Sequence, residues 1–237
     1  MKPIIGIVGR CGFTSSDEVN NIRIPEKYRM SVIRSGGIPI GIMPPQIVEY
    51  QDAIPSKLDK LTLEEKEILT RQLDMCNGII FPGGLKRFEY DIFILEYALK
   101  RDIPILGICL GMQILTMLDR DGNFVTNLDV IDSDINHADY SNRLVHEVKI
   151  SKDSKLYSII KKESILVNSR HRMKVVDTGS FDVYGTSSDG VIELIERHDK
   201  KFAIGVQWHP EMMFDSLEQK LLFDSFVDAC REWFYED

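Results

Sequence analysis

The chain has 237 residues, enough to bury a sizeable apolar core without disulfides or a structural metal. Its 29 Lys and Arg residues against 37 Asp and Glu residues give a net charge of −8, which argues against a protein that binds a nucleic-acid backbone. With 43% hydrophobic and 28% charged residues, the composition is that of a folded soluble protein and excludes disorder as the main state.

Four cysteines, Cys11, Cys76, Cys109 and Cys230, occur without CxxC pairs and without histidines at zinc-finger spacing. The longest apolar stretch, residues 103–118, is shorter than the roughly 20 residues that span a bilayer, and the N-terminus lacks signal-peptide architecture. We therefore expect a cytoplasmic, reducing location, in which a conspicuous cysteine should be tested as a thiol.

Short apolar runs bounded by Gly or Pro recur through the first half and predict strands that are buried on both faces of a parallel sheet. These runs cover residues 3–9, 38–43, 78–81 and 104–109. Between them, Thr62-Leu-Glu-Glu65 is a capping-box helix start, and residues 88–101 have the apolar spacing of a second helix. The alternation predicts an α/β fold with a doubly wound, flavodoxin-like, mostly parallel sheet flanked by helices. Ligands of such sheets bind beyond the carboxyl ends of the strands.

The second half predicts a mixed or antiparallel extension of this sheet. After an Asp-rich segment at residues 119–143, strands are expected at residues 145–150, 164–167, 181–186, 191–196 and 202–207. Asp215-Ser-Leu-Glu218 has the pattern of another capping box and predicts a last helix. The inward face of that helix would carry Phe223, Phe226, Val227, Cys230 and Phe234. Because the sequence contains no repeat and no low-complexity linker, we expect residues 1–237 to form a single domain.

Gly107-Ile-Cys-Leu-Gly111 lies between a predicted strand and a predicted helix. The G-x-C-x-G pattern is the thiol version of the nucleophile elbow, whose glycines permit a tight strand-to-helix turn. Such a turn lifts Cys109 out of the sheet at a helix N-terminus, where the helix dipole favours a thiolate. It also leaves the backbone N–H of Leu110 free to stabilise an oxyanion. The alternative interpretation of this pentapeptide alone is a buried structural cysteine beside a packing glycine.

Two further segments complete the predicted site. Gly205-Val-Gln-Trp-His-Pro-Glu211 offers a base for the thiol and a group that orients this base. His209 and Glu211 flank Pro210, so in an extended or turn geometry the carboxylate can accept from the imidazole. Phe81-Pro-Gly-Gly84 ends another predicted parallel strand at the same edge, and its glycines suit a second oxyanion donor.

The segments FPGG, GICLGMQ and GVQWHPE resemble, in sequence order, the motifs of the class I (triad) glutamine amidotransferase-like superfamily. The resemblance implies that Cys109 is the nucleophile, His209 the base and Glu211 the residue that orients it. The matching oxyanion positions are Gly84 and Leu110, and the matching substrate-binding positions nearby are Gly83 and Gln113.

Other segments resemble one branch, the γ-glutamyl-γ-aminobutyrate hydrolase-like proteins of peptidase family C26. They are residues 2–7, the first helix and second strand between Tyr28 and Ile40, Val167-Asn-Ser-Arg-His171 and residues 189–193. The resemblance implies a cysteine-dependent hydrolase that cleaves the γ-glutamyl amide bond of a small molecule and releases glutamate through a γ-glutamyl thioester. It implies no metal and no organic cofactor.

The chain departs from the branch in two regions that tend to line the substrate mouth. Arg172-Met173 replaces a second histidine after His171, and residues 119–124 replace a Gly-rich stretch. Substrate contacts are expected from Ser169, Arg170, His171, Arg172, Lys86 and Arg87. If these loops converge as the resemblance implies, the cations suit a leaving amine that carries an anionic group. The amine would be like γ-aminobutyrate, or it would belong to another anionic γ-glutamyl amide, including a phosphorylated or nucleotide-linked one. The alternative is that the cations are solvated or paired with Glu89, Asp91 and their neighbours.

The Asp-rich segment is expected to be a mobile lid or a solvated surface loop. Asp132, Asp134 and Asn136 are spaced like the start of a calcium loop, but His137 and Arg143 stand where glycine and an acidic ligand are needed. We therefore expect no metal there. His137, His146 and His198 show no partner pattern and are assigned no chemistry.

Two other functions remain open at this point. One is the ammonia-supplying glutaminase subunit of a glutamine amidotransferase, which would need a separate synthetase subunit as partner. The other is a non-catalytic regulatory or binding member of the fold, against which the presence of Cys109, His209 and Glu211 together argues. The expected partner is otherwise a small γ-glutamyl molecule, with no nucleic acid and no membrane, and a homodimer is compatible with the sequence.

Overall fold

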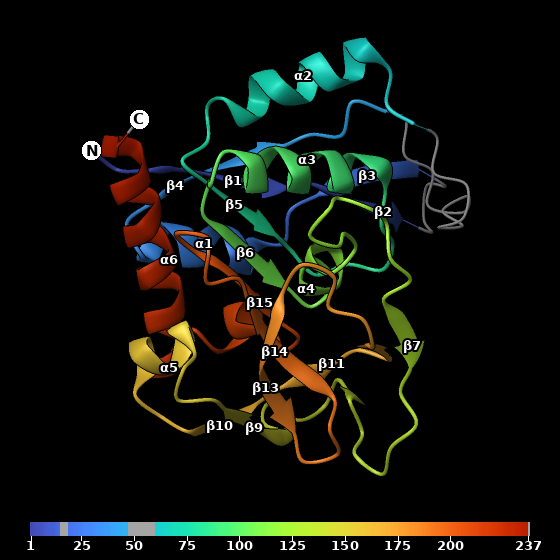
Figure 1. The fold of residues 1–237 in the computed structure, drawn as a ribbon, viewed down its shortest axis with the longest axis vertical. Coiled ribbons are helices and arrows are strands. Elements are labelled where there is room, and N and C mark those ends of the chain that lie inside the picture. Colours follow the sequence, from blue (N-terminus) through green and yellow to red (C-terminus); the bar gives the residue numbers. More distant parts are fainter. Residues whose placement is uncertain (15–18, 47–59, 237) are drawn as a thin grey trace.

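The structure, a computed structural model, describes the backbone of residues 1–14, 19–46 and 60–236. Its main feature is a nine-stranded sheet with the strand order β10-β9-β13-β14-β15-β6-β5-β1-β4 (Figure 1). Strands β15 to β4 pair in parallel, whereas the pairs from β10 to β15 are antiparallel. The predicted α/β fold, with a parallel sheet and a mixed extension, is thus confirmed.

The parallel half consists of the strands predicted from apolar runs. Their bounds are β1 (Ile4–Val8), β4 (Ile38–Ile42), β5 (Gly78–Phe81), β6 (Ile105–Ile108) and β15 (Ala203–Val206). Every residue of β5, β6 and β15 is buried, because helices cover both faces of this part of the sheet. The continuous apolar composition of the strands follows from that double coverage.

Two core clusters lie on the two faces of the sheet. One contains side chains from α2 (Leu63–Leu73), α3 (Glu89–Lys100) and α4 (Leu110–Leu115). The other contains side chains from α1 (Glu26–Arg34), α5 (Lys155–Ile160) and α6 (Leu217–Glu236). The arrangement is therefore doubly wound, as predicted.

The predicted capping box at α2 is present. The Thr62 side chain accepts from the Glu65 N–H at 3.2 Å, and the Glu65 carboxylate accepts from the Thr62 N–H at 2.7 Å. At α6, the Asp215 carboxylate instead pairs with Arg143, and the Ser216 hydroxyl donates to Glu218. The α6 residues Phe223, Phe226, Val227 and Cys230 are fully buried; the side chain of Phe234 lies outside the described part.

The antiparallel half extends the sheet beyond β15. Its strands are β9 (His146–Ile150), β10 (Ser164–Val167), β13 (Asp182–Ser187) and β14 (Ile192–Glu196). In β9 the burial alternates residue by residue, as expected for a strand with one face in the core. The register of β14 against β15 aligns Leu194 with Val206, so β14 begins beside the carboxyl end of β15.

Short strand pairs that the apolar pattern did not predict complete the fold. They are β2 (Arg10–Thr14) with β3 (Val19–Arg23), β7 (Leu128–Val130) with β12 (Met173–Val175), and β8 (Ala138–Asp139) with β11 (Ser169–Arg170). Through β7 and β8, part of the 119–143 segment packs against the protein. Asn127 is 1% exposed and His137 is 3% exposed, so the expectation of a solvated loop is wrong for this part.

A single-turn 3₁₀ helix, η2 (Pro210–Met213), links β15 to α6. Among the described residues, no helix combines the length and the apolar character that crossing a bilayer requires.

Candidate active site

Cys109 occupies a strained turn between β6 and α4. Its φ of 54° and ψ of −107° lie where residues with a side chain are rarely found. The flanking glycines allow this turn because α4 packs directly against the sheet. A Cβ at Gly111 would lie 1.9 Å from the carbonyl oxygen of Phe81, and a Cβ at Gly107 would lie 2.8 Å from the Leu115 side chain. The geometry matches the elbow predicted from G-x-C-x-G.

His209 and Glu211 lie between β15 and α6, at the edge where Cys109 leaves β6. The His209 Nδ1 and the Glu211 Oε1 are 2.7 Å apart, so Nδ1–H donates to the carboxylate and Nε2 remains for another partner. Burial opposes the charged imidazole, but the charges of Glu211 and Cys109 outweigh it and hold the pKa of His209 well above its usual value. The site therefore favours a protonated imidazole beside the Cys109 sulfur.

Asn168 holds the backbone of His209 from both sides. Its side-chain amide donates to the His209 carbonyl at 2.8 Å, and its side-chain oxygen accepts from the His209 N–H at 2.8 Å. Sequence reasoning did not select Asn168 as a site residue, although it lies within the Val167–His171 segment that carried the resemblance. The segment was noticed, but the sequence does not indicate the contact itself, because His209 lies 41 residues away from Asn168 along the chain.

Tyr28, on α1, is a second residue that the sequence did not single out. The Gly83 N–H donates to the Tyr28 hydroxyl at 2.9 Å, so this N–H is engaged within the protein. Burial and the charge of Glu211 raise the pKa of Tyr28 well above its usual value, which keeps the phenol neutral. A Cβ at Gly83 would lie 2.7 Å from the His209 Cε1; glycine there leaves room for the imidazole.

The two predicted oxyanion residues are neighbours. A Cβ at Gly84 would lie 2.9 Å from the Leu110 side chain, and the Leu110 N–H is at the first position of α4, where no intrahelical acceptor exists. Behind Gly84 lies a buried ion pair between Arg10 and Asp91, which are 3% and 0% exposed. Asp91 also accepts from the Phe88 N–H at 3.0 Å. The ion pair therefore fixes the end of the loop between β5 and α3 relative to Arg10 of β2.

Three predicted substrate-binding residues are buried. Gln113 is 5% exposed and donates to the Gln207 side chain at 3.3 Å. Ser169 and His171 face His137, with the Ser169 Oγ 3.1 Å and the His171 Nε2 3.3 Å from the His137 Nδ1. Gln113 lies on α4, and its N–H donates to the Cys109 carbonyl at 3.2 Å, whereas Ser169 and His171 belong to a separate cluster of histidines.

The four predicted cations have different surroundings. Arg87 donates to the Asn127 side chain at 2.8 Å, and the Arg170 guanidinium lies over the Tyr140 ring at 5.7 Å. Arg172 is exposed and lines a cavity of about 400 Å³ between the 130–138 segment and His171. Lys86 contributes to the electrostatic environment of Cys11. Their convergence on a substrate entrance remains a prediction.

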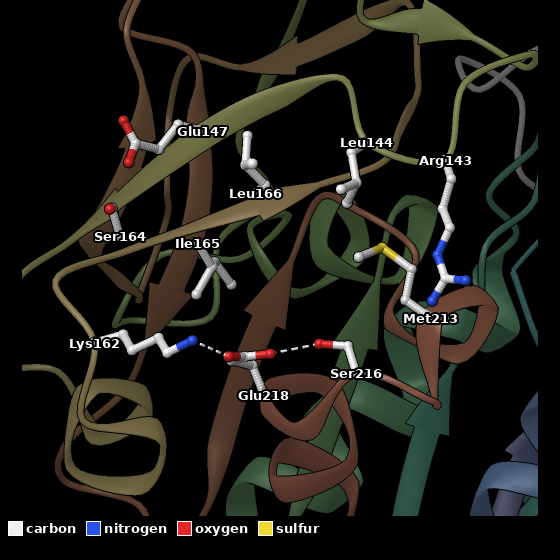
Figure 2. A pocket seen from close by; sticks show the side chains of 10 residues that line it. All are labelled: Arg143, Leu144, Glu147, Lys162, Ser164, Ile165, Leu166, Met213, Ser216 and Glu218. Carbon is white, nitrogen blue, oxygen red and sulfur yellow. Dashed lines mark hydrogen bonds and ion pairs between the residues drawn. The ribbon is translucent and has the colours of Figure 1, made fainter.

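A larger cavity, of about 510 Å³, lies elsewhere on the molecule (Figure 2). Its lining residues are Arg143, Leu144, Glu147, Lys162, Ser164, Ile165, Leu166, Met213, Ser216 and Glu218. Lys162 and Glu218 form an ion pair in its lining, and none of its lining residues is a predicted site residue. We therefore locate the candidate chemistry at Cys109 and not in this cavity.

Comparisons with known proteins show the family and the fold of this chain. The chain is 29% identical to protein NtpR of Enterococcus hirae over 96% of this chain and 99% of that protein. It is 27% identical to the γ-glutamyl-γ-aminobutyrate hydrolase PuuD of Escherichia coli over 97% of this chain and 94% of that protein. The solved glutaminase domain of Trypanosoma brucei CTPS, with bound acivicin, has the same fold, with a TM-score of 0.63, 18% identity and coverage of 98% and 94% of the two chains. The family model of peptidase C26 matches residues 3–211, and the chain belongs to this family.

Proposed function

We propose that this chain is a hydrolase that cleaves the γ-glutamyl amide bond of a small molecule, with Cys109, His209 and Glu211 as its catalytic triad. The observation that carries the proposal is the strained Cys109 turn beside a histidine whose Nδ1 lies 2.7 Å from the Glu211 carboxylate. A thiol, a base and an orienting acid in this order are the parts that nucleophilic acyl transfer requires.

In the first half of the reaction, the Cys109 thiolate attacks the γ-carbonyl carbon and forms a C–S bond. The negative charge that develops on the carbonyl oxygen is stabilised by the N–H groups of Leu110 and Gly84. When the tetrahedral intermediate collapses, the C–N bond breaks, and His209 gives its proton to the departing amine. The raised pKa of His209 supports this role, because the imidazole carries the proton before the amine leaves.

In the second half, neutral His209 takes a proton from water, and the resulting hydroxide equivalent attacks the γ-glutamyl thioester. The C–S bond breaks, glutamate leaves, and the thiolate–imidazolium pair is restored. Glu211 holds the imidazole in the tautomer that both halves need, and Asn168 fixes the backbone that carries it. Neither half requires a cofactor.

The leaving amine is the finer part of the proposal. PuuD, which this chain resembles over almost its full length, is named for a substrate whose amine carries a carboxylate. The exposed Arg172 and the neighbouring Arg170 suit such an anion. We therefore place γ-glutamyl amides with an anionic amine, either a carboxylate or a phosphate, ahead of neutral ones.

A panel of γ-glutamyl amides tests this function. Purified wild-type protein and a Cys109→Ala variant are assayed for glutamate release from γ-glutamyl-aminobutyrate, a phosphorylated γ-glutamyl amide, a neutral γ-glutamyl amide and glutamine. We expect release from at least one amide by the wild type and a loss of about 10⁴-fold or more in the variant. Equal rates for the two proteins, or no release by the wild type from any of the amides, would contradict the proposal.

Glutaminase activity is the second candidate, and the likeness to the Trypanosoma brucei glutaminase domain with bound acivicin favours it. A glutaminase would prefer glutamine over every other amide of the panel. It would also lose activity on treatment with acivicin, with the adduct on Cys109. A preference for γ-glutamyl amides with larger amines would favour the first candidate.

A further inference from the structure

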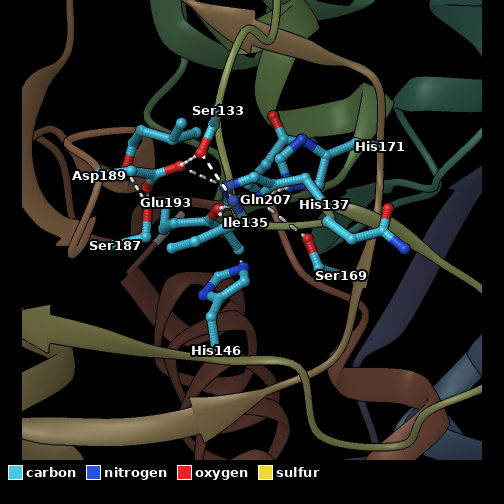
Figure 3. Close-up of polar contacts among 12 residues, drawn as sticks. Ser133, Ile135, His137, His146, Ser169, His171, Ser187, Asp189, Glu193 and Gln207 are labelled. Atoms are coloured by element: carbon cyan, nitrogen blue, oxygen red, sulfur yellow. Dashed lines mark hydrogen bonds and ion pairs between the residues drawn. The ribbon is translucent and has the colours of Figure 1, made fainter.

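We propose that His137, His146, His171 and Glu193 form a binding site for a transition-metal cation and that Zn²⁺ is the ion that fits it best. Figure 3 shows these side chains pointing toward one another from four separate segments of the chain. His137 precedes β8, His146 begins β9, His171 follows β11, and Glu193 lies in β14. The sequence predicted no metal site and indicated no role for His137 and His146.

Four of the six distances between the facing atoms are close to those of a tetrahedral site. The Glu193 Oε1 lies 3.4 Å from the His137 Nδ1, 3.5 Å from the His146 Nε2 and 3.4 Å from the His171 Nε2. The His137 Nδ1 and the His171 Nε2 are 3.3 Å apart, and all four ligand atoms lie within 4.8 Å of one another. A tetrahedron around Zn²⁺ with metal–ligand bonds of about 2.0–2.1 Å has edges of about 3.3–3.4 Å.

In His137 and His171, the ring nitrogen that faces away from the cluster makes a hydrogen bond that fixes the tautomer a metal requires. The His137 Nε2 is 2.9 Å from the Asp189 Oδ2, and the His171 Nδ1 is 3.0 Å from the Met173 carbonyl oxygen. Each of these nitrogens therefore donates outward, which leaves a lone pair on the inward nitrogen. A carboxylate or carbonyl behind each metal-binding imidazole is the usual support of a metal site. Asp189 is in turn held by the hydroxyls of Ser133 and Ser187.

The cluster also lacks the hydrogen bonds that such buried groups normally make. Glu193 is 0% exposed, and among the described residues no hydrogen bond of ordinary geometry reaches either of its carboxylate oxygens or the His146 Nε2. Hydrogen bonds between imidazolium and carboxylate would be shorter, at about 2.7–2.9 Å. A buried carboxylate surrounded by inward lone pairs needs a cation for charge balance, and a metal satisfies all four groups at once.

The kind of ligand selects the metal. Three imidazoles and one carboxylate suit Zn²⁺ and other first-row divalent ions, whereas Mg²⁺ and Ca²⁺ prefer six or more oxygen ligands. All four ligands come from the protein and all four are buried, which is typical of a structural zinc site and not of a catalytic one. The Ser169 hydroxyl lies 3.1 Å from the His137 Nδ1 and competes with the metal for this inward nitrogen.

Such a metal would fix the segments that surround the candidate active site. It would join the 119–143 segment to the sheet through His137, and it would hold the 168–171 segment through His171. Asn168 of that segment holds the His209 backbone, and the Glu193 carbonyl accepts from the Gln207 N–H at 2.9 Å. The metal is therefore a positioning element for His209, and it takes no part in the reaction at Cys109.

Metal analysis of the purified chain tests the site without any assay of activity. The wild type is incubated with Zn²⁺, separated from free metal by gel filtration and analysed by plasma mass spectrometry. We expect about one zinc per chain in the wild type and less than about a tenth of that in His146→Ala and in the isosteric Glu193→Gln. His198→Ala is the matched control, because His198 also pairs with a β14 carboxylate, that of Glu196, at 2.7 Å; it should retain the full zinc content.

Two further measurements separate this proposal from folding defects and from the proposed function. Cobalt(II) bound to wild-type protein should show the strong visible bands of four-coordinate Co²⁺ without a thiolate charge-transfer band. This measurement needs no variant, so it still tests the site if the variants fail to fold. Cys109→Ala should bind the metal fully while it loses hydrolysis. A zinc-free wild type, a six-coordinate cobalt spectrum, zinc lost with Cys109, or full zinc retained by a folded Glu193→Gln would each overturn the proposal.

Discussion

The Cys109 site and the histidine cluster are both buried polar assemblies near the carboxyl end of β15, yet they are assembled in different ways. Cys109 follows directly after β6, His209 is three residues beyond the end of β15, and Glu211 is two residues beyond His209. The four side chains of the cluster are spread over residues 137–193 and come from segments with no common pattern. The first site is made of short contiguous motifs, and the second exists only after the antiparallel half has folded.

This difference shows what kind of site a sequence reveals. A strand-to-turn motif fixes the position of a side chain locally, because the parallel sheet brings all such turns to one edge. A cluster drawn from short bridges and an antiparallel extension depends on register, and register is a property of the whole sheet. Substitutions in each region test whether the two regions are separable.

After the loss of Cys109 itself, the largest expected effect is that of Glu211→Gln on catalysis. The charge of Glu211 holds His209 protonated against the effect of burial, and the carboxylate fixes its tautomer. We expect kcat to fall by roughly 10³–10⁴-fold. Because removal of the charge lowers the pKa of His209, the alkaline limb of the kcat profile should move to lower pH. The pH dependence of kcat measures both effects.

A glutamate outside the site provides the control for this change. Glu218→Gln removes the carboxylate that pairs with Lys162, so it should leave kcat and both limbs of the profile unchanged. An alkaline limb at the same pH in wild type and Glu211→Gln would show that Glu211 does not set the protonation of His209. Zinc content should be equal in all three proteins.

Gly111→Ala tests the packing that forms the elbow. The added Cβ would lie 1.9 Å from the backbone carbonyl oxygen of Phe81, which cannot move without displacing β5. We expect the free energy of unfolding to fall by about 3 kcal/mol or more, measured by urea denaturation. Gly190→Ala is the matched control, because a Cβ at Gly190 would meet no atom within 4 Å. Its φ of 82° leaves only the cost of a left-handed backbone, so the free energy of unfolding should fall by about 1 kcal/mol. Equal losses would argue against direct contact between α4 and β5.

Asn168→Ala tests the connection between the two regions. The change removes both hydrogen bonds to the His209 backbone but no ligand of the cluster. We expect kcat to fall by about 10–100-fold with little change in KM, and we expect the zinc content to stay at the wild-type level. Asn142→Ala, which removes a solvent-exposed hydrogen bond to the Asp139 carboxylate, serves as control. Loss of zinc with Asn168 would mean that the two regions are one cooperative unit.

Sequence patterns predicted the parallel sheet, the capping box of α2 and the strands of the antiparallel half, because each depends on composition within a few residues. They did not predict β7, β8, β11 and β12, since strands of two or three residues carry no detectable period. They also missed Asn168 and Tyr28, whose partners are 41 and 55 residues away. His137 looked like part of a polar loop because only the fold shows that it is buried.

The smallest expected effect concerns the predicted substrate entrance. If Lys86 and Arg172 contact an anionic amine, the Lys86→Ala/Arg172→Ala double variant should lose about 3–10-fold in kcat/KM on anionic γ-glutamyl amides and nothing on neutral ones. Steady-state kinetics on paired substrates measures the difference. Unchanged kcat/KM on both classes would remove the argument for an anionic leaving group.

The central claim is that Cys109 becomes acylated by a γ-glutamyl group. The most direct test is to mix the wild type with a chromogenic γ-glutamyl anilide, quench the mixture in acid within the first turnover and map the modified peptide by mass spectrometry. We expect a γ-glutamyl thioester on the peptide that contains Cys109 and no adduct in Cys109→Ala. Anilide cleavage that persists in Cys109→Ala, or an adduct on another residue, would contradict it.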